Sequence, residues 1–99
     1  MGFKVISQEE AKEMLKDEHC QLIDVRDANA FSAGHIKGAC NVGDHNISQY
    51  MADADPDKPL LICCYAGRMS QNVAQHFVEQ GFEKVYSIDG GFSAWKQED

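Results

Sequence analysis

The sequence predicts an α/β domain with a central, mainly parallel sheet that is flanked by helices on both faces. Two observations support this fold class. Short apolar segments alternate with amphipathic ones along the chain, which is the pattern of strands joined by helices. Residues 60–64 are also apolar at both alternating sets of positions, so this strand is expected to be covered on both sides. Parallel neighbours joined by helices imply right-handed crossovers.

The length and composition fit one domain. The 99 residues are 43% hydrophobic and 25% charged, close to the averages of globular domains, and no repeat, linker or low-complexity tract interrupts them. We therefore expect residues 1–99 to form a single domain.

The first helix is predicted from its capping residues. Ser7 and Glu10 have the spacing of a capping box, in which each side chain bonds the backbone of the other residue. A helix is expected from there through about Lys16. Residues 21–25, with the apolar Leu22, Ile23 and Val25, follow as a short strand.

The middle of the chain is predicted to contain two short helices with a strand between them. Asp27 is a suitable N-cap for a helix over residues 28–33, and Gly34 is expected to end it. A short strand over residues 39–42 and a helix over residues 45–54 come next.

The last third of the chain is predicted to contain a longer helix, a strand and a final short helix. Residues 70–80 place apolar side chains on one helical face, and Gly81 is the expected stop. Residues 84–88 form the next strand, and a glycine-rich turn leads to a short helix anchored by Phe92 and Trp95.

The charge of the chain excludes some classes of partner. The net charge is -7, whereas nucleic acids and anionic membranes favour proteins with a basic face, so we expect neither as a partner. A small anionic substrate would need local donors, because the overall field repels it. The sequence has no apolar run of signal-peptide or membrane-spanning length, so the cytoplasm is the expected location.

The cysteines are expected to be reduced thiols. The ordinary hydrophobic patterning needs no disulfides for stability, and we interpret Cys20, Cys40 and Cys63 as core residues. No Cys-x-x-Cys or His-x-x-x-His pair is present, so no metal site is expected.

Cys64 is different, because it ends the buried strand and opens a glycine-containing loop before a helix. We call residues 64–70 the cysteine loop. Ligands bind at this edge of open parallel sheets, and the helix N-terminus and the backbone amides can stabilise a thiolate and bind an anion. The sequence thus predicts a nucleophilic thiol at the lip of an anion-binding loop, with Cys63 pointing to the opposite side of the strand. The residues expected to bind the substrate are Tyr65, Ala66, Gly67, Arg68, Met69 and Ser70.

Two side chains of the cysteine loop have more than one interpretation. Arg68 is either a solvated surface residue or an anion ligand. Tyr65 either forms a wall of the pocket or caps the core. Local sequence places no histidine near Cys64, so activation by a Cys-His pair is not predicted.

Four motifs in order resemble the rhodanese domain, and the resemblance runs from about residue 5 to residue 97. Within that family the chain is most similar to the short, single-domain thiosulfate sulfurtransferases. The motifs are Asp24-Val25-Arg26-Asp27; Phe31 with Gly34-His35-Ile36-Lys37-Gly38-Ala39-Cys40-Asn41-Val42; Cys64-x-x-Gly67-x-x-Ser70; and Asp89-Gly90-Gly91-Phe92-x-x-Trp95.

The resemblance implies ping-pong sulfur transfer. The Cys64 thiolate would attack the outer sulfur of thiosulfate, or of another small sulfur donor, and sulfite would leave. Cyanide, thioredoxin or a small thiol would then attack the persulfide. The amides of the cysteine loop would hold the anionic sulfur, and neither a metal nor an organic cofactor would be needed.

One position departs from the family pattern. Many rhodanese loops carry arginine where this chain has Met69, and here the arginine comes one residue earlier, as Arg68. The anion contacts of the family's arginine therefore do not transfer directly. Arg26 is expected to form a structural ion pair.

Three alternative functions remain at this stage. A cysteine-based phosphatase or arsenate reductase needs an arginine after five intervening residues, and that position is Ser70. A rhodanese-like module that only binds a partner would normally lack the loop cysteine, but a present and idle thiol fits this alternative too. A redox sensor would use the same activated thiolate.

Overall fold

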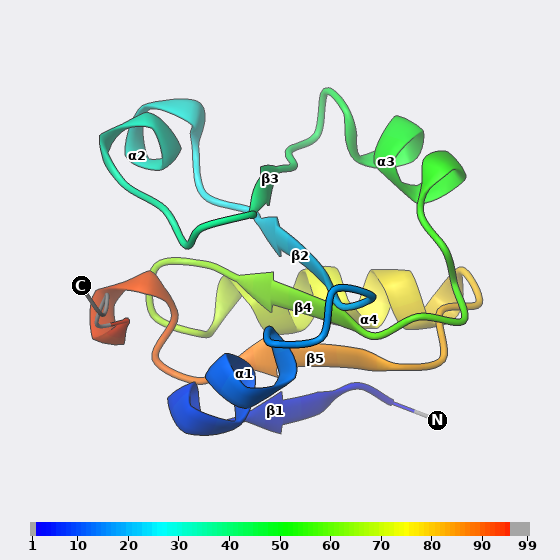
Figure 1. Ribbon diagram of the computed structural model, residues 1–99. Coiled ribbons are helices and arrows are strands. Elements are labelled where there is room, and N and C mark those ends of the chain that lie inside the picture. The colour runs from blue at the N-terminus through cyan, green and yellow to red at the C-terminus, as the bar shows by residue number, and fades with distance from the viewer. Residues whose placement is uncertain (1, 96–99) are drawn as a thin grey trace.

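The computed structural model describes residues 2–95 and contains one five-stranded sheet in the order β1-β5-β4-β2-β3 (Figure 1). Every neighbouring pair of strands is parallel, which agrees with the predicted sheet. The strands are β1 (Lys4–Ile6), β2 (Gln21–Asp24), β3 (Cys40–Asn41), β4 (Leu60–Cys63) and β5 (Val85–Ile88).

Helices connect the strands and cover both faces of the sheet, as predicted. They are α1 (Gln8–Met14), α2 (Ala28–Ala33), α3 (Ile47–Asp53), α4 (Met69–Glu79) and the 3-10 helix η1 (Phe92–Ala94). The caps expected for the first two helices are present. Ser7 and Glu10 form the reciprocal capping box of α1, and the Asp27 carboxylate accepts the Ala30 amide at the start of α2.

The side chains of β4 divide between two hydrophobic cores. Leu60 and Ile62 pack with α3 and α4, whereas Leu61 and Cys63 pack with α1 and η1 on the other face. All four side chains are fully buried. This alternation explains why the segment is apolar at every position, and it confirms that Cys63 points into the core.

Some element boundaries differ from the predictions. β1 was not predicted, because it has only three residues and Ile6 is the only one buried, which is too short for a detectable periodicity. α1 ends at Met14 rather than near Lys16, and α3 begins at Ile47 rather than at residue 45. β4 ends at Cys63, so Cys64 belongs to the loop and not to the strand.

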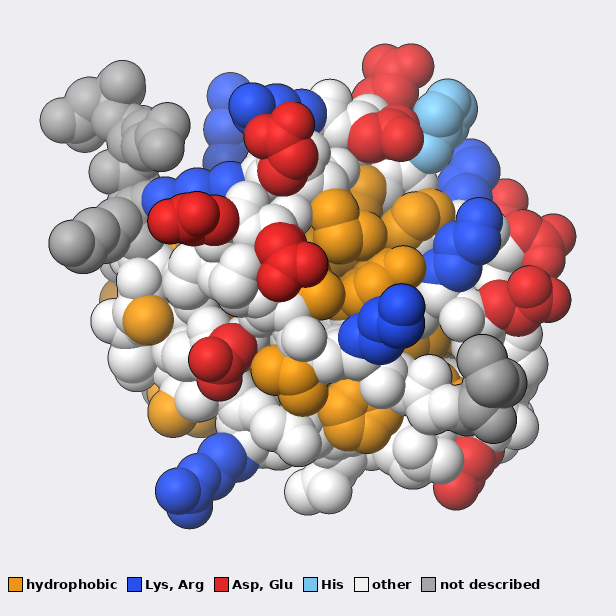
Figure 2. All heavy atoms as spheres, turned by 90° about the horizontal axis from the view of Figure 1, so that it is seen from below, with side chains coloured by type: hydrophobic (Ala, Val, Ile, Leu, Met, Phe, Trp, Pro, Cys, Tyr) orange, Lys and Arg blue, Asp and Glu red, His pale blue; other side chains and the backbone are white. Residues whose placement is uncertain are grey.

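The open edge of the sheet at β1 carries an exposed apolar side chain, because Val5 is 49% exposed. Figure 2 views the molecule from below, the side on which β1 lies in Figure 1, and shows hydrophobic side chains surrounded by both acidic and basic ones. No helix within residues 2–95 is long and apolar enough to cross a membrane.

The parallel arrangement brings the carboxyl ends of all five strands to one edge. The loops that follow β2 and β4 and the turn that follows β5 therefore meet there. This edge contains the cysteine loop.

Candidate active site

The Cys64 thiol is enclosed at the base of the cysteine loop. The residue is only 1% exposed, so the prediction of a thiol at the lip of the loop was wrong. The Gly67 amide donates to Cys64 Sγ at 3.1 Å, and Ser70 Oγ lies 3.2 Å from the same sulfur. The thiol is the donor in the bond to Ser70, whereas a hydrogen bond from a backbone amide such as that of Gly67 favours the thiolate form of a cysteine, which is the nucleophilic form.

The turn after β5 holds the backbone of the cysteine loop. The Phe92 amide donates to the Cys64 carbonyl at 2.7 Å, and the Ser93 amide donates to the Tyr65 carbonyl at 3.0 Å. The approach is so close that a Cβ on Gly91 would lie 2.3 Å from the Cys64 carbonyl oxygen. Glycine at this position therefore lets the two backbones meet.

Gln8 supports this turn from the start of α1. Its side-chain amide donates to the carbonyls of Asp89 and Gly91. The Gln8 Oε1 atom is buried and has no hydrogen-bond partner among the described residues. Gln8 could not be singled out from its sequence position, because its role depends on β1 lying beside β5.

A second hydroxyl lies behind Ser70. The Oγ atoms of Ser70 on α4 and Ser87 on β5 are 2.7 Å apart, and both residues are fully buried. Sequence reasoning missed Ser87. Its signal was a polar residue at a position of β5 where the alternating pattern predicts an apolar one, two residues after the buried Val85.

The prediction that Arg26 forms a structural ion pair is confirmed. Its guanidinium binds the Asp24 carboxylate, with Nη2 at 2.7 Å from Oδ2, and donates to the Gly34 carbonyl at 2.6 Å. The hydrogen bond to Asp24 raises the pKa of Arg26 above its usual value. The guanidinium carbon also lies 4.2 Å from the ring centre of Phe92, so Arg26 links α2 to η1.

Tyr65 lies on the outside of the cysteine loop and does not cap the core, because it is 40% exposed. Its hydroxyl donates to the carboxylate of Asp27, the residue that caps α2. This bond lowers the pKa of Asp27 below its ordinary value, and the bond from the Ala30 amide makes a smaller contribution in the same direction. The Tyr65 ring therefore stands between the cysteine loop and α2.

The remaining residues of the cysteine loop are exposed. Ala66 and Arg68 are at the surface, and Met69 is 45% exposed. Arg68 makes no ion pair or side-chain hydrogen bond with any residue from 2 to 95. Of the six residues predicted to bind substrate, Gly67 and Ser70 contact Cys64 Sγ and the other four form the rim.

The other cysteines have different surroundings. All four cysteines are free thiols in the structure. Burial raises the pKa of Cys20 to about 11 and that of Cys63 to about 12, so neither is a ready nucleophile. The prediction that Cys40 is a core residue was wrong. It is exposed, because it lies on the two-residue edge strand β3.

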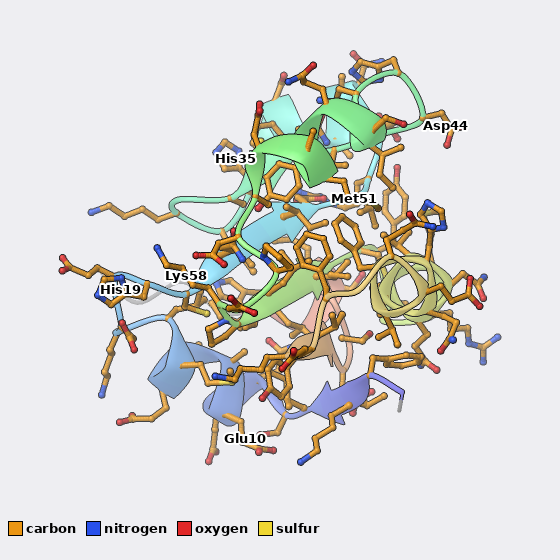
Figure 3. All side chains as sticks on the ribbon, turned by 90° about the vertical axis from the view of Figure 1, so that its right-hand side faces the viewer. Glu10, His19, His35, Asp44, Met51 and Lys58 are labelled. Carbon is orange, nitrogen blue, oxygen red and sulfur yellow. The ribbon has the colours of Figure 1, made fainter. Side chains whose placement is uncertain are left out.

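No histidine within residues 2–95 is hydrogen-bonded to Cys64 Sγ, whose partners are Gly67 and Ser70. Figure 3 shows His19 far from α4, and the His35 ring stacks on Phe31 with its Nδ1 2.7 Å from the Phe31 carbonyl. Within the described part of the chain, no group of three His, Cys, Asp or Glu side chains could hold a metal ion.

Fold and site together define a parallel α/β domain with a cysteine loop at the carboxyl edge of its sheet. The family model of the rhodanese-like domain matches residues 7–98. This chain belongs to the rhodanese-like domain family, which confirms the resemblance seen in its motifs.

Curated relatives and solved structures agree with this assignment. The chain is 46% identical over 96 residues to a thiosulfate sulfurtransferase GlpE of Shewanella oneidensis, covering 97% of this chain and 95% of the relative. It is 46% identical over 94 residues to a protein of the same name from Pseudomonas putida, covering 95% and 86%. A crystal structure of a rhodanese-like domain protein from Staphylococcus aureus matches with a TM-score of 0.84 and 25% identity, covering 97% of this chain and 94% of that one.

Proposed function

We propose that this protein is a thiosulfate sulfurtransferase in which Cys64 carries the transferred sulfur as a persulfide. The observation that supports this proposal most is the environment of Cys64 Sγ, which accepts a hydrogen bond from the Gly67 amide and lies beside the Ser70 hydroxyl. Relatives that are 46% identical over nearly the whole chain bear the name of this activity.

The proposed reaction has two half-reactions. The Cys64 thiolate attacks the outer sulfur of thiosulfate, the S–S bond of the donor breaks, and sulfite leaves with the bonding electron pair. A nucleophilic acceptor, either cyanide or a thiolate, then attacks the outer sulfur of the persulfide, and the Cys64 thiolate leaves. In each half-reaction the leaving group keeps the electron pair of the broken bond, so no outside oxidant or reductant is needed. The proposal therefore includes neither a metal nor an organic cofactor.

In this proposal the residues of the cysteine loop have two different roles. Gly67 and Ser70 stabilise the thiolate that attacks in the first half-reaction and leaves in the second. The rim residues Tyr65, Ala66, Arg68 and Met69 meet the donor. Arg68 is the exposed cation of the loop, and we assign it the attraction of the anionic donor.

The proposal also covers partners and location. The donors are thiosulfate or another small sulfur compound, and the acceptors are cyanide, thioredoxin or a small thiol. Free thiols suit a reducing compartment, so we place the protein in the cytoplasm. We treat residues 1–99 as one rhodanese domain and propose no nucleic acid or membrane as a partner.

The phosphatase alternative is not favoured by the site. The position where that chemistry needs a guanidinium is Ser70, which is fully buried and hydrogen-bonded within the protein. Neither the binding-module nor the redox-sensor alternative is favoured by a specific observation.

Steady-state formation of thiocyanate from thiosulfate and cyanide tests the proposal. The wild type is expected to give parallel double-reciprocal lines, as ping-pong catalysis requires. Cys64→Ser should lose activity by at least about a thousand-fold, whereas Cys40→Ser, which changes an exposed thiol outside the loop, should retain it. Activity that survives in Cys64→Ser would refute the assignment.

A further inference from the structure

The buried hydroxyl of Ser87 lies one hydrogen bond away from the sulfur site. It is 2.7 Å from Ser70 Oγ, which is itself 3.2 Å from Cys64 Sγ. Ser87 is 0% exposed and lies in β5 two residues after Val85, which packs against α4 in an apolar core. A hydroxyl in such a place is costly unless it has a partner, and Ser70 is the partner of Ser87.

The two serines form a chain of hydrogen bonds that can reverse its direction. When Cys64 is a neutral thiol, its S–H can donate to Ser70, and the Ser70 hydroxyl can donate to Ser87. When the thiol has lost its proton to solvent, sulfur can only accept. Ser70 must then turn its proton toward Sγ, and its oxygen becomes free to accept the proton of Ser87.

We propose that Ser87 is a positioning residue for Cys64, which acts through Ser70. By donating to Ser70, the Ser87 hydroxyl aligns the Ser70 proton with the sulfur and strengthens that bond, since hydrogen bonds in series polarise one another. Only hydroxyl protons rotate, so the change needs no movement of heavy atoms. This inference rests on the proposed role of Cys64 as the nucleophile.

The test measures the thiolate and not sulfur transfer. The rate of Cys64 alkylation by iodoacetamide is recorded against pH for Ser87→Ala, with each modified peptide identified by mass spectrometry. All proteins carry Cys40→Ser to remove the exposed thiol. Ser48→Ala removes an exposed hydroxyl on α3 and is the matched control.

Ser87→Ala is expected to react about three- to ten-fold more slowly than the wild type at pH 7, because one hydrogen bond supporting the thiolate is lost. Its rate should reach the wild-type value at high pH, where the thiol is ionised in both proteins. Ser87→Thr, which keeps the hydroxyl, should restore the profile, and Ser48→Ala should not differ from the wild type.

A purely structural role would give a different result. In that case Ser87→Ala would change the unfolding temperature or the limiting rate while the pH profile stayed in place, and the inference would be overturned. Should Ser87→Ala not fold, Ser87→Cys keeps a weaker donor, and an unshifted profile there would also overturn it. Failure of the sulfurtransferase proposal appears separately, as an absence of thiocyanate formation by the wild type.

Discussion

Tyr65 connects the cysteine loop to α2 through its hydroxyl, which donates to the Asp27 carboxylate and accepts from the Asp27 amide. Because the bond from the Tyr65 hydroxyl lowers the pKa of the Asp27 carboxyl, it stabilises the fold above the ordinary carboxyl pKa of about 3.9, and the stabilisation is lost as the pH falls through the lowered value. We expect Tyr65→Phe to raise the pKa of Asp27 toward its ordinary value, as measured by NMR titration of the carboxyl carbon. An unchanged pKa would show that Tyr65 is not the cause.

The ion pair of Asp24 and Arg26 is a second feature that depends on single residues. Arg26 is 6% exposed and Asp24 is fully buried, so Asp24→Asn leaves a buried guanidinium without its counter-charge. We expect a loss of about 3–5 kcal/mol in the free energy of unfolding, measured by urea denaturation. Glu13→Gln breaks the exposed pair with Lys16 and should cost less than about 1 kcal/mol. Equal losses in the two variants would contradict this account.

At the scale of elements, the contact between the β5–η1 turn and the cysteine loop requires glycine. Gly91 has φ +53° and approaches the Cys64 carbonyl, whereas Gly81 has φ +100° with open space around the position of a Cβ. Both alanine variants are strained by about 1–2 kcal/mol, but only Gly91→Ala also displaces the cysteine loop. We expect a loss of sulfur transfer of at least about ten-fold for Gly91→Ala and near wild-type kcat for Gly81→Ala. Similar kcat values in the two variants would show that the loop does not depend on this contact.

Elements with a local signal were predictable from sequence. The capping residues Ser7 and Asp27 and the continuous apolar run of β4 each reflect physics that acts over a few residues. The three-residue strand β1 carries no such signal. The exposure of Cys40 was missed because the sequence pattern does not reveal that β3 is an edge strand.

The same distinction holds for the site. The cysteine loop follows directly from a strand, a glycine and a helix in sequence, so Cys64, Gly67 and Ser70 could be named in advance. Ser87 reaches the cysteine loop, and Gln8 reaches the turn that holds it, only because β5 lies between β1 and β4, and strand order is not encoded in periodicity. Tertiary contacts of this kind can be identified only once the structure is known.

For the whole molecule, the net charge of -7 acts against an anionic donor, and Figure 2 shows acidic and basic side chains mixed on the same face. Raising the ionic strength from about 10 mM to about 150 mM shortens the screening length from about 30 Å to about 8 Å and weakens this repulsion. We expect kcat/KM for thiosulfate to rise by about two-fold or more over that range. A fall would mean that local attraction by Arg68 outweighs the overall field, and Arg68→Gln would then reverse the salt dependence, so that kcat/KM rises with ionic strength.

Whether Cys64 carries sulfur as a persulfide can be determined from the intact mass of the protein. The protein is incubated with thiosulfate and desalted, and its intact mass is measured by mass spectrometry. The Cys64→Ser variant is treated in the same way. We expect a gain of one sulfur atom, about 32 Da, on the wild type alone, since covalent catalysis requires this intermediate. A wild type that gains no mass from thiosulfate or from polysulfide, or a Cys64→Ser variant that gains as much as the wild type, would contradict it.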